Sequence, residues 1–134
     1  DSASLLYSAG HIALVQGKLD GEGKVEVPLI TDWENRPRQM VHFELGKAAK
    51  TLYQALEYLP QQDISRVLLT PITGRSHQLR VHMLHIGHPI TGDKIYHPEP
   101  QRSPLKRMAL HASYLAFPQP LSGVPIEIKA DIPF

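Results

Sequence analysis

The chain has 134 residues, of which 42% are hydrophobic and 20% are charged, a composition typical of one soluble globular domain. The absence of cysteine excludes disulfides, thiolate zinc sites and a cysteine nucleophile. No apolar run approaches the ~20 residues that cross a bilayer, and no signal segment opens the sequence. The sequence starts at Asp1 and not at methionine, so we expect a processed product or a piece of a longer protein.

The net charge of +1 is unevenly distributed along the sequence. Residues 1–69 carry a net charge of −2, whereas residues 70–111 carry +4 and hold six of the eight histidines. A basic, histidine-rich segment on a nearly neutral chain indicates a surface that faces phosphate groups. An ordinary solvated face would explain the charges equally well.

The predicted elements begin after residues 1–10, which are small and weakly patterned and predict a loose end. Alternating or β-branched apolar residues then predict five or six strands, at residues 11–15, 25–29, 49–58, 64–70, 109–117 and 126–130. A turn at residues 19–24 and an irregular loop at residues 31–40 separate the first of them. Residues 49–58 would also suit a helix, but their alternation of polar and apolar side chains favours a strand.

One helix is predicted between the fourth and fifth strands. Ser76 stands where a helix N-cap belongs, and Gly87 predicts that the helix ends near Ile86. Residues 97–106 contain three prolines and predict a loop. The fold class is therefore α+β, a single domain over residues 1–134 with a mostly antiparallel or mixed sheet and one main helix.

The start of this helix carries Arg75, His77, Gln78 and Arg80. The free N–H groups and the dipole at a helix N-terminus favour anions, and the arginines strengthen that preference. On a wheel of ~100° per residue, Arg80 lies beside the apolar stripe of the helix. We therefore expect a half-buried guanidinium that needs a carboxylate or phosphate partner. The alternative is an arginine whose stem is buried while its head reaches solvent.

The histidines suggest a metal site, because His82, His85 and His88 recur at every third residue. A helical zinc site normally uses ligands four residues apart with a carboxylate nearby. No Asp or Glu lies between His77 and His88. We therefore predict no metal, and structural hydrogen bonds or polar surface are the preferred interpretation of these side chains.

Few residues are available for acid–base or nucleophilic chemistry. Asp20, Asp32 and Asp93 fall in turns or loops, and nothing in their local sequence marks any of them as a tuned acid or base. The sequence contains no Gly-x-Ser-x-Gly elbow, no phosphate-binding Gly-Lys-Ser loop and no dinucleotide fingerprint. The residues alone thus indicate an anion-binding edge and no further chemistry.

Longer motifs are more specific. The run GRSHQLRVHMLHIGHPITGDKIY at residues 74–96 resembles the signature of the RluA family of RNA pseudouridine synthases. The segments RMALHASYLAFPQPLSG, PLITDWENRPRQM and GKAAKTLYQALEY are similar to the corresponding parts of that family. The resemblance extends from about residue 11 to residue 134 and implies the C-terminal half of the pseudouridine synthase fold.

The resemblance implies an isomerase that converts uridine to pseudouridine in ribosomal or transfer RNA without a cofactor. In this family a catalytic aspartate acts at the sugar of a uridine that is flipped out of its stem-loop. The family arginine that pairs with this aspartate matches Arg80. The edge of the family's RNA pocket matches Arg75, His77 and Gln78, which would meet phosphate or neighbouring main chain. A wider RNA-facing surface, chiefly of phosphate contacts, is expected from Lys94, Arg102, Lys106 and Arg107.

The sequence departs from the family in two respects. It lacks the His-Arg-Leu-Asp motif that carries the nucleophile, and His11 stands where the family has a pocket tyrosine. We therefore expect a portion of a cytoplasmic synthase that is inactive alone, with an exposed sheet edge that allows self-association. One alternative is a degenerate homologue that binds RNA without catalysis. A structural or metal-binding domain is a more distant one.

Overall fold

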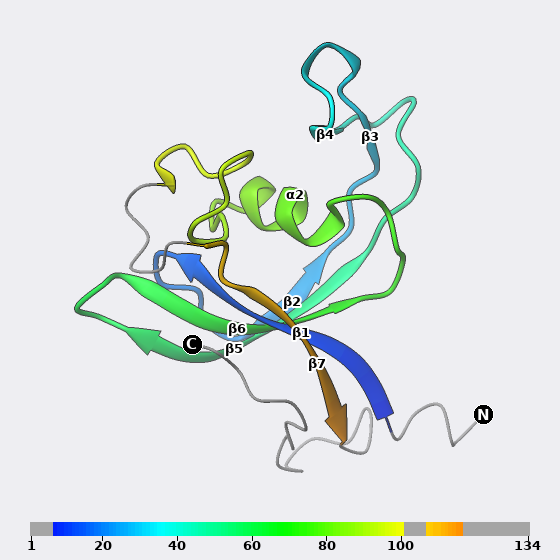
Figure 1. Ribbon diagram of the computed structural model, residues 1–134. Coiled ribbons are helices and arrows are strands. Elements are labelled where there is room, and N and C mark those ends of the chain that lie inside the picture. Colours follow the sequence, from blue (N-terminus) through cyan, green and yellow to red (C-terminus); the bar gives the residue numbers. More distant parts are fainter. Residues whose placement is uncertain (1–6, 101–106, 117–134) are drawn as a thin grey trace.

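Antiparallel strands, one α-helix and a short 3-10 helix make up the part of the molecule that the structure describes, residues 7–100 and 107–116 of a computed structural model (Figure 1). The elements in chain order are β1 (Tyr7–Gln16), β2 (Glu22–Val25), β3 (Leu29–Thr31), the short 3-10 helix η1 (Trp33–Asn35), β4 (Gln39–Val41), β5 (Thr51–Leu59), β6 (Ile64–Pro71), α2 (Gln78–His85) and β7 (Leu110–Ala116). Within these residues, no helix is both long enough and apolar enough to cross a membrane.

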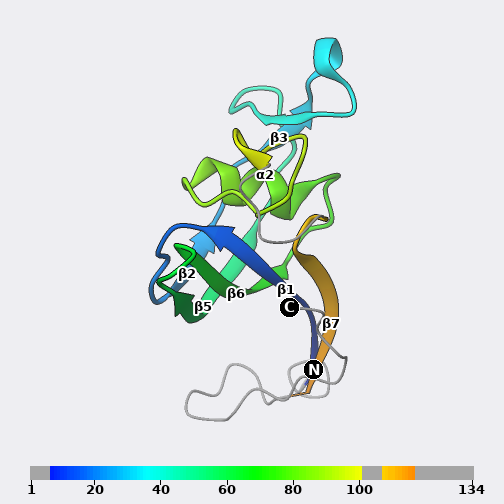
Figure 2. The same cartoon turned by 60° about the vertical axis from the view of Figure 1, so that its left-hand side comes forward.

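Among the described residues, the larger sheet contains five strands in the order β2-β5-β6-β1-β7, and all neighbours are antiparallel. In its registers Ala13 of β1 lies opposite Val67 of β6, and Leu69 of β6 lies opposite Tyr53 of β5. The smaller sheet pairs β3 with β4 and projects away from the larger one (Figure 1). Helix α2 lies between the larger sheet and this projecting hairpin in both views (Figure 2).

The main core forms where α2 packs on the larger sheet. Alternate residues of a strand point to the same face, so one residue in two of β1 and β6 contributes to it. The buried members of this cluster are Ala13, Val15, Leu19, Val67, Leu69, Leu79, Met83 and Ile90. Ile12, Leu14 and Leu68 alternate with them and are also buried, so both faces of the sheet are covered at its centre. This double burial explains why the two strands read as continuous apolar runs.

The α+β class, the antiparallel sheet and the strands at residues 11–15, 49–58 and 64–70 are confirmed. The prediction of a loose end is wrong for residues 7–10, because this stretch of β1 pairs with β7, about 100 positions later in the sequence. Residues 1–6 lie outside the described part.

The predicted strand at residues 25–29 is wrong, since β2 ends at Val25 and β3 starts only at Leu29. The intervening Pro28 has no N–H group with which to continue a ladder. The predicted loop at residues 31–40 contains η1 and the start of β4. The strand predicted at residues 126–130 lies outside the described residues.

The helix starts later than predicted. His77, and not Ser76, is the N-cap residue, and it adopts a left-handed conformation with φ of 55° and no side-chain cap. The end is as predicted, because Ile86 is the C-cap and Gly87 follows with φ of 86°. The predicted strand at residues 109–117 is confirmed as β7, and residues 97–100 of the predicted loop are irregular.

Candidate functional site

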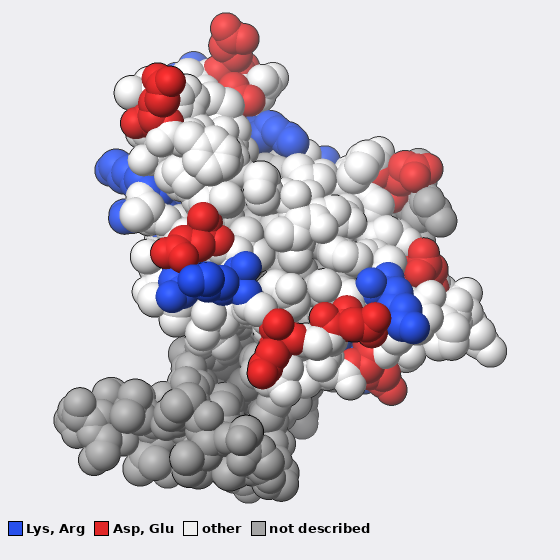
Figure 3. All heavy atoms as spheres, turned by 180° about the vertical axis from the view of Figure 1, so that it is seen from behind, with Lys and Arg blue, Asp and Glu red and all other residues white. Residues whose placement is uncertain are grey.

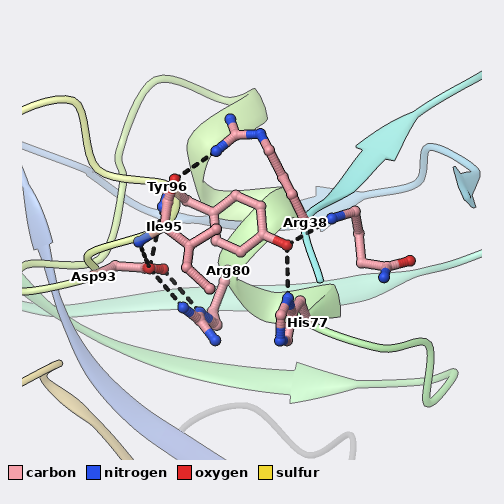
Figure 4. A network of polar contacts seen from close by, with 7 residues as sticks. Arg38, His77, Arg80, Asp93, Ile95 and Tyr96 are labelled. Atoms are coloured by element: carbon pink, nitrogen blue, oxygen red, sulfur yellow. Dashed lines mark hydrogen bonds and ion pairs between the residues drawn. The ribbon is translucent and has the colours of Figure 1, made fainter. Parts of the chain in front are cut away.

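Arg80 of α2 and Asp93 of the following loop form a two-point ion pair (Figure 4). The guanidinium donates from Nε to Oδ2 at 2.9 Å and from Nη2 to Oδ1 at 2.7 Å. The Asp93 side chain is fully buried, and that of Arg80 is 17% exposed. Parallel bonds of this kind are the strongest and most directional form of the arginine–carboxylate contact. The half-buried arginine with a carboxylate partner, expected from the helical wheel, is thus confirmed.

The loop around Asp93 is built to hold this carboxylate in place. Gly92 has φ of +78°, and a Cβ atom there would lie 2.4 Å from the carbonyl oxygen of Arg107. Asp93 Oδ1 also accepts the N–H groups of Ile95 at 3.1 Å and Tyr96 at 3.2 Å. An aspartate that accepts N–H groups two and three residues ahead stabilises a turn. The Asp93 side chain therefore stabilises its own loop and holds Arg80 of α2.

Tyr96 connects this pair to the start of the helix and to the projecting hairpin. Its hydroxyl oxygen accepts the N–H of Gln39 at 2.8 Å and lies 2.7 Å from Nδ1 of His77. The guanidinium carbons of Arg38 and Arg80 lie 4.8 and 5.1 Å from the centre of its ring. Cations at this distance from an aromatic face are attracted to it. Arg38 also donates to the carbonyl of Ile95, so β4 is tied to the loop at two points (Figure 4).

Burial and charge set the protonation of both partners in the Tyr96–His77 hydrogen bond. Burial raises the pKa of Tyr96, so the phenol keeps its proton. Burial, followed by the positive charge of Arg80, lowers the pKa of His77, so the ring is neutral at neutral pH. In the tautomer in which the Tyr96 hydroxyl donates to Nδ1, the His77 proton is on Nε2, and no residue within 7–100 and 107–116 accepts it.

Gln78 meets neighbouring main chain, one of the two kinds of partner that the resemblance implied for it. The residue is 3% exposed. Its Nε2 donates to the carbonyl of Lys50 and the hydroxyl of Thr51, and its Oε1 accepts from Thr73 and from the N–H of Arg75. These four bonds use the full capacity of the amide. Gln78 therefore joins the start of α2 to β5.

The other predicted site residues are placed as follows. Arg75, Lys94 and Arg107 are exposed, and Arg75 Nε donates to the carbonyl of Ala48 at 2.8 Å. His77 and Arg80 are half-buried at the start of α2. Arg102 and Lys106 lie outside the described residues. On the face shown in Figure 3, described side chains of both charges lie close together with uncharged atoms between them, so this side is not uniformly basic.

His82 and His88 make structural hydrogen bonds, whereas His85 is exposed, so both preferred interpretations of these side chains occur. His82 is fully buried, with Nε2 3.0 Å from the carbonyl of Val27 and Nδ1 2.8 Å from the hydroxyl of Thr51. His88 Nδ1 lies 2.8 Å from the carbonyl of Gln16. No group of three His, Cys, Asp or Glu side chains among the described residues is arranged to hold a metal ion.

Arg38, Asp93 and Tyr96 belong to this site and were not predicted. The sequence did contain one signal for Asp93, because it is the only acidic residue between Ile64 and Pro98. It was therefore the one carboxylate available nearby to a buried Arg80. No such signal exists for Arg38, because its contact with Tyr96 joins positions 58 residues apart.

Comparison with known proteins identifies the family. The sequence profile described as RNA pseudouridylate synthase matches residues 11–85, more than half of the chain. The chain belongs to this family.

Two bacterial pseudouridine synthases show how closely the chain follows the RluA branch. It is 56% identical over 111 residues to the dual-specificity RNA pseudouridine synthase RluA of Pasteurella multocida, which covers 82% of this chain and 50% of the relative. It is 50% identical over 113 residues to the protein of the same name from Escherichia coli, with 84% and 51% covered. The chain therefore spans about half the length of the curated relatives it matches.

Solved pseudouridine synthase structures share the fold. Human RNA pseudouridylate synthase domain containing 1 has a TM-score of 0.72 at 27% identity, covering 96% of this chain and 56% of that one. Human RNA pseudouridylate synthase domain containing 4 has a TM-score of 0.64 at 20% identity, which shows a common fold. The resemblance to the pseudouridine synthase fold is thus confirmed.

His11 takes a distinctive position in this pseudouridine synthase fold. It lies on β1 opposite Leu69, on the same face as Ala13. Its Nδ1 is buried without a hydrogen-bond partner among the described residues. Burial, and then the proximity of His111, lowers the pKa of His11. His11 is therefore neutral at neutral pH.

Proposed function

We propose that this chain forms part of an enzyme that isomerises uridine to pseudouridine in ribosomal or transfer RNA. Membership of the pseudouridine synthase family supports this proposal, as do close relatives named dual-specificity RNA pseudouridine synthases. The structural observation that carries it is Arg80, a guanidinium held by a buried carboxylate and still partly open to a ligand.

Arg80 has the chemistry to engage a second anion. A guanidinium has five N–H donors, and Asp93 uses two of them, on Nε and Nη2. The hydrogen bond with Asp93 raises the pKa of Arg80, whereas burial opposes this effect, and the group stays charged. We propose that Arg80 also pairs with the family's catalytic aspartate and keeps it ionised, because a nearby positive charge favours the carboxylate form.

The chain does not contain the His-Arg-Leu-Asp motif of that aspartate, so we expect its 134 residues to be inactive alone. The reaction itself needs no oxidant or cofactor. The bond between the ribose and N1 of uracil breaks, and a bond between the ribose and C5 forms. One proton leaves C5 and another is taken up at N1, so substrate and product have the same composition.

The exposed cations near α2 would hold the RNA. We propose that Arg75, Lys94 and Arg107 contact phosphates, as we predict for Arg102 and Lys106. His77 would donate its Nε2–H to a phosphate or to a base beside the flipped uridine.

Such an RNA substrate is consistent with a cytoplasmic protein. Self-association through a sheet edge stays a prediction, and the four-residue outer strand β2 opposes it with exposed Glu22 and Lys24.

The test uses the full-length gene product and measures pseudouridine in a stem-loop RNA by mass spectrometry after chemical labelling. Arg80→Ala should lower kcat at least about 100-fold and change the Kd for RNA less than about threefold. Arg66→Ala is the matched control, because Arg66 makes an ion pair with Glu57 on the far end of β5 and β6. Normal turnover by Arg80→Ala would refute the assigned role. RNA binding by the wild-type protein without any pseudouridine would favour a degenerate homologue.

A further inference from the structure

We propose that Asp93 is a positioning residue that fixes the orientation of the Arg80 guanidinium for the isomerisation reaction. This inference rests on the proposed function. Asp93 is fully buried, whereas Arg80 is partly exposed, so the carboxylate cannot itself meet RNA. Its influence on the reaction must pass through the arginine.

The two carboxylate oxygens of Asp93 accept hydrogen bonds from different sets of donors. Oδ1 accepts three donors, namely Nη2 of Arg80 and the N–H groups of Ile95 and Tyr96. Oδ2 accepts one donor, Nε of Arg80, at 2.9 Å. A carboxylate that served only the turn would need Oδ1 alone. The hydrogen bond at Oδ2 therefore serves to hold Arg80 and not the turn.

Together these contacts determine where the remaining donors of Arg80 point. Asp93 holds the edge formed by Nε and Nη2, and the Tyr96 ring lies against the guanidinium at 5.1 Å. Nη1 is the nitrogen that Asp93 does not contact, and it points away from Asp93 (Figure 4). Tyr96 is fixed in turn by Gln39 and His77. Donors held in this way need no reorganisation when charge develops at the reacting group.

The chemistry of Asp93→Asn separates positioning from turn stability. An asparagine keeps Oδ1, which can still accept the N–H groups of Ile95 and Tyr96. It places an NH2 group where Oδ2 lay, so two donors, the new NH2 and Nε of Arg80, face each other. The variant also removes the negative charge. The turn thus keeps its acceptor, whereas Arg80 keeps only the bond from Nη2 and loses the second bond, from Nε, that fixes its orientation.

The experiment compares Asp93→Asn, Arg80→Ala and the double variant in the full-length protein. Asp93→Asn should lower kcat by about 10- to 100-fold with less than about a threefold change in KM for RNA. In the Arg80→Ala background the same change should cost less than about threefold more. Ser65→Ala is the control, because Ser65 is a fully buried polar residue that bonds Gly17 and Leu19 and does not contact Arg80.

A rescue assay tests directly whether Asp93 holds a guanidinium in the position that the Arg80 side chain occupies. Guanidinium ions should restore activity to Arg80→Ala saturably and better than methylammonium, because two carboxylate oxygens select a planar fork over a point charge. The double variant should show no rescue. The comparison of the two cations in Arg80→Ala decides the question even where variants that carry Asp93→Asn do not fold.

Several results would overturn the inference. These are an unchanged kcat in Asp93→Asn, losses that multiply in the double variant, or methylammonium rescue equal to that by guanidinium. An Arg80→Ala protein with normal turnover would instead refute the role of Arg80 within the proposed function. The two failures are therefore distinguishable.

Discussion

His82 should make the stability of the protein depend on pH below neutrality. The ring is fully buried, with Val27 accepting from Nε2 and the hydroxyl of Thr51 donating to Nδ1. Burial lowers the pKa of His82 in the folded state, whereas in the unfolded chain it returns to its ordinary value of 6.5. The unfolded state therefore binds more protons between these two values. The stabilisation is fully present above pH 6.5 and is lost as the pH falls towards the folded-state pKa.

The size of the effect follows from linkage. One proton taken up only on unfolding costs about 1.4 kcal/mol per pH unit, so the loss between pH 6.5 and 5 reaches up to about 2 kcal/mol. His82→Leu removes this dependence. At pH 7.5 the variant should itself be less stable by about 1–3 kcal/mol, because the carbonyl of Val27 loses its donor. The Thr51 oxygen still accepts from Gln78, but its O–H also loses its acceptor.

The assay is urea unfolding of both proteins at pH 7.5 and pH 5. The difference in unfolding free energy between wild type and His82→Leu should shrink by up to about 2 kcal/mol at the lower pH. His11 and His77 also have lowered pKa values, but they are present in both proteins and cancel in the difference. A difference that stays the same at both pH values would refute the assignment of a buried neutral His82.

The remaining predictions concern the loop and the RNA contacts. Gly92→Ala should lower the free energy of unfolding by at least about 2 kcal/mol. The left-handed φ alone costs about 1–2 kcal/mol, and the new Cβ would meet Arg107. Unchanged urea unfolding of this variant would contradict the prediction. Arg75→Ala and Lys94→Ala should each weaken RNA binding and reduce the slope of log K against log salt by about 0.7–0.9, while kcat is retained. Lys24→Ala, on the outer strand β2, is the control, and an equal effect there would show that the loss is nonspecific.

Local sequence patterns predicted the elements whose partners are close in the sequence. β5 and β6 form a hairpin, and local signals were sufficient to find them: alternation for β5 and a run of apolar residues for β6. The first residues of β1 were missed because their ordering comes from β7, and a window of ten residues contains no trace of that partner. Ser76 was a reasonable N-cap by residue type, but the left-handed backbone of His77 starts the helix instead.

In the functional site, too, local patterns were informative and contacts between distant parts of the sequence were not. The position of Arg80 on a helical wheel was enough to predict a half-buried guanidinium and the kind of partner it needs. Its real partner, Asp93, and the contacting Tyr96 lie beyond a glycine turn whose path a sequence does not reveal. The motif left phosphate and neighbouring main chain open as partners of Gln78, and the buried amide meets Lys50, Thr51 and Thr73.

The strand order of the larger sheet also determines how the chain can fold during synthesis. β5 and β6 are neighbours in sequence and can pair as soon as both are made, and β1 can then join β6. The other side of β1 receives β7 only after residue 110 has been translated. Pairings of such large sequence separation form slowly and leave strand edges open in the meantime. At a synthesis rate of about 5–20 residues per second, this edge of β1 stays open for several seconds, and open strand edges are sites where chains aggregate.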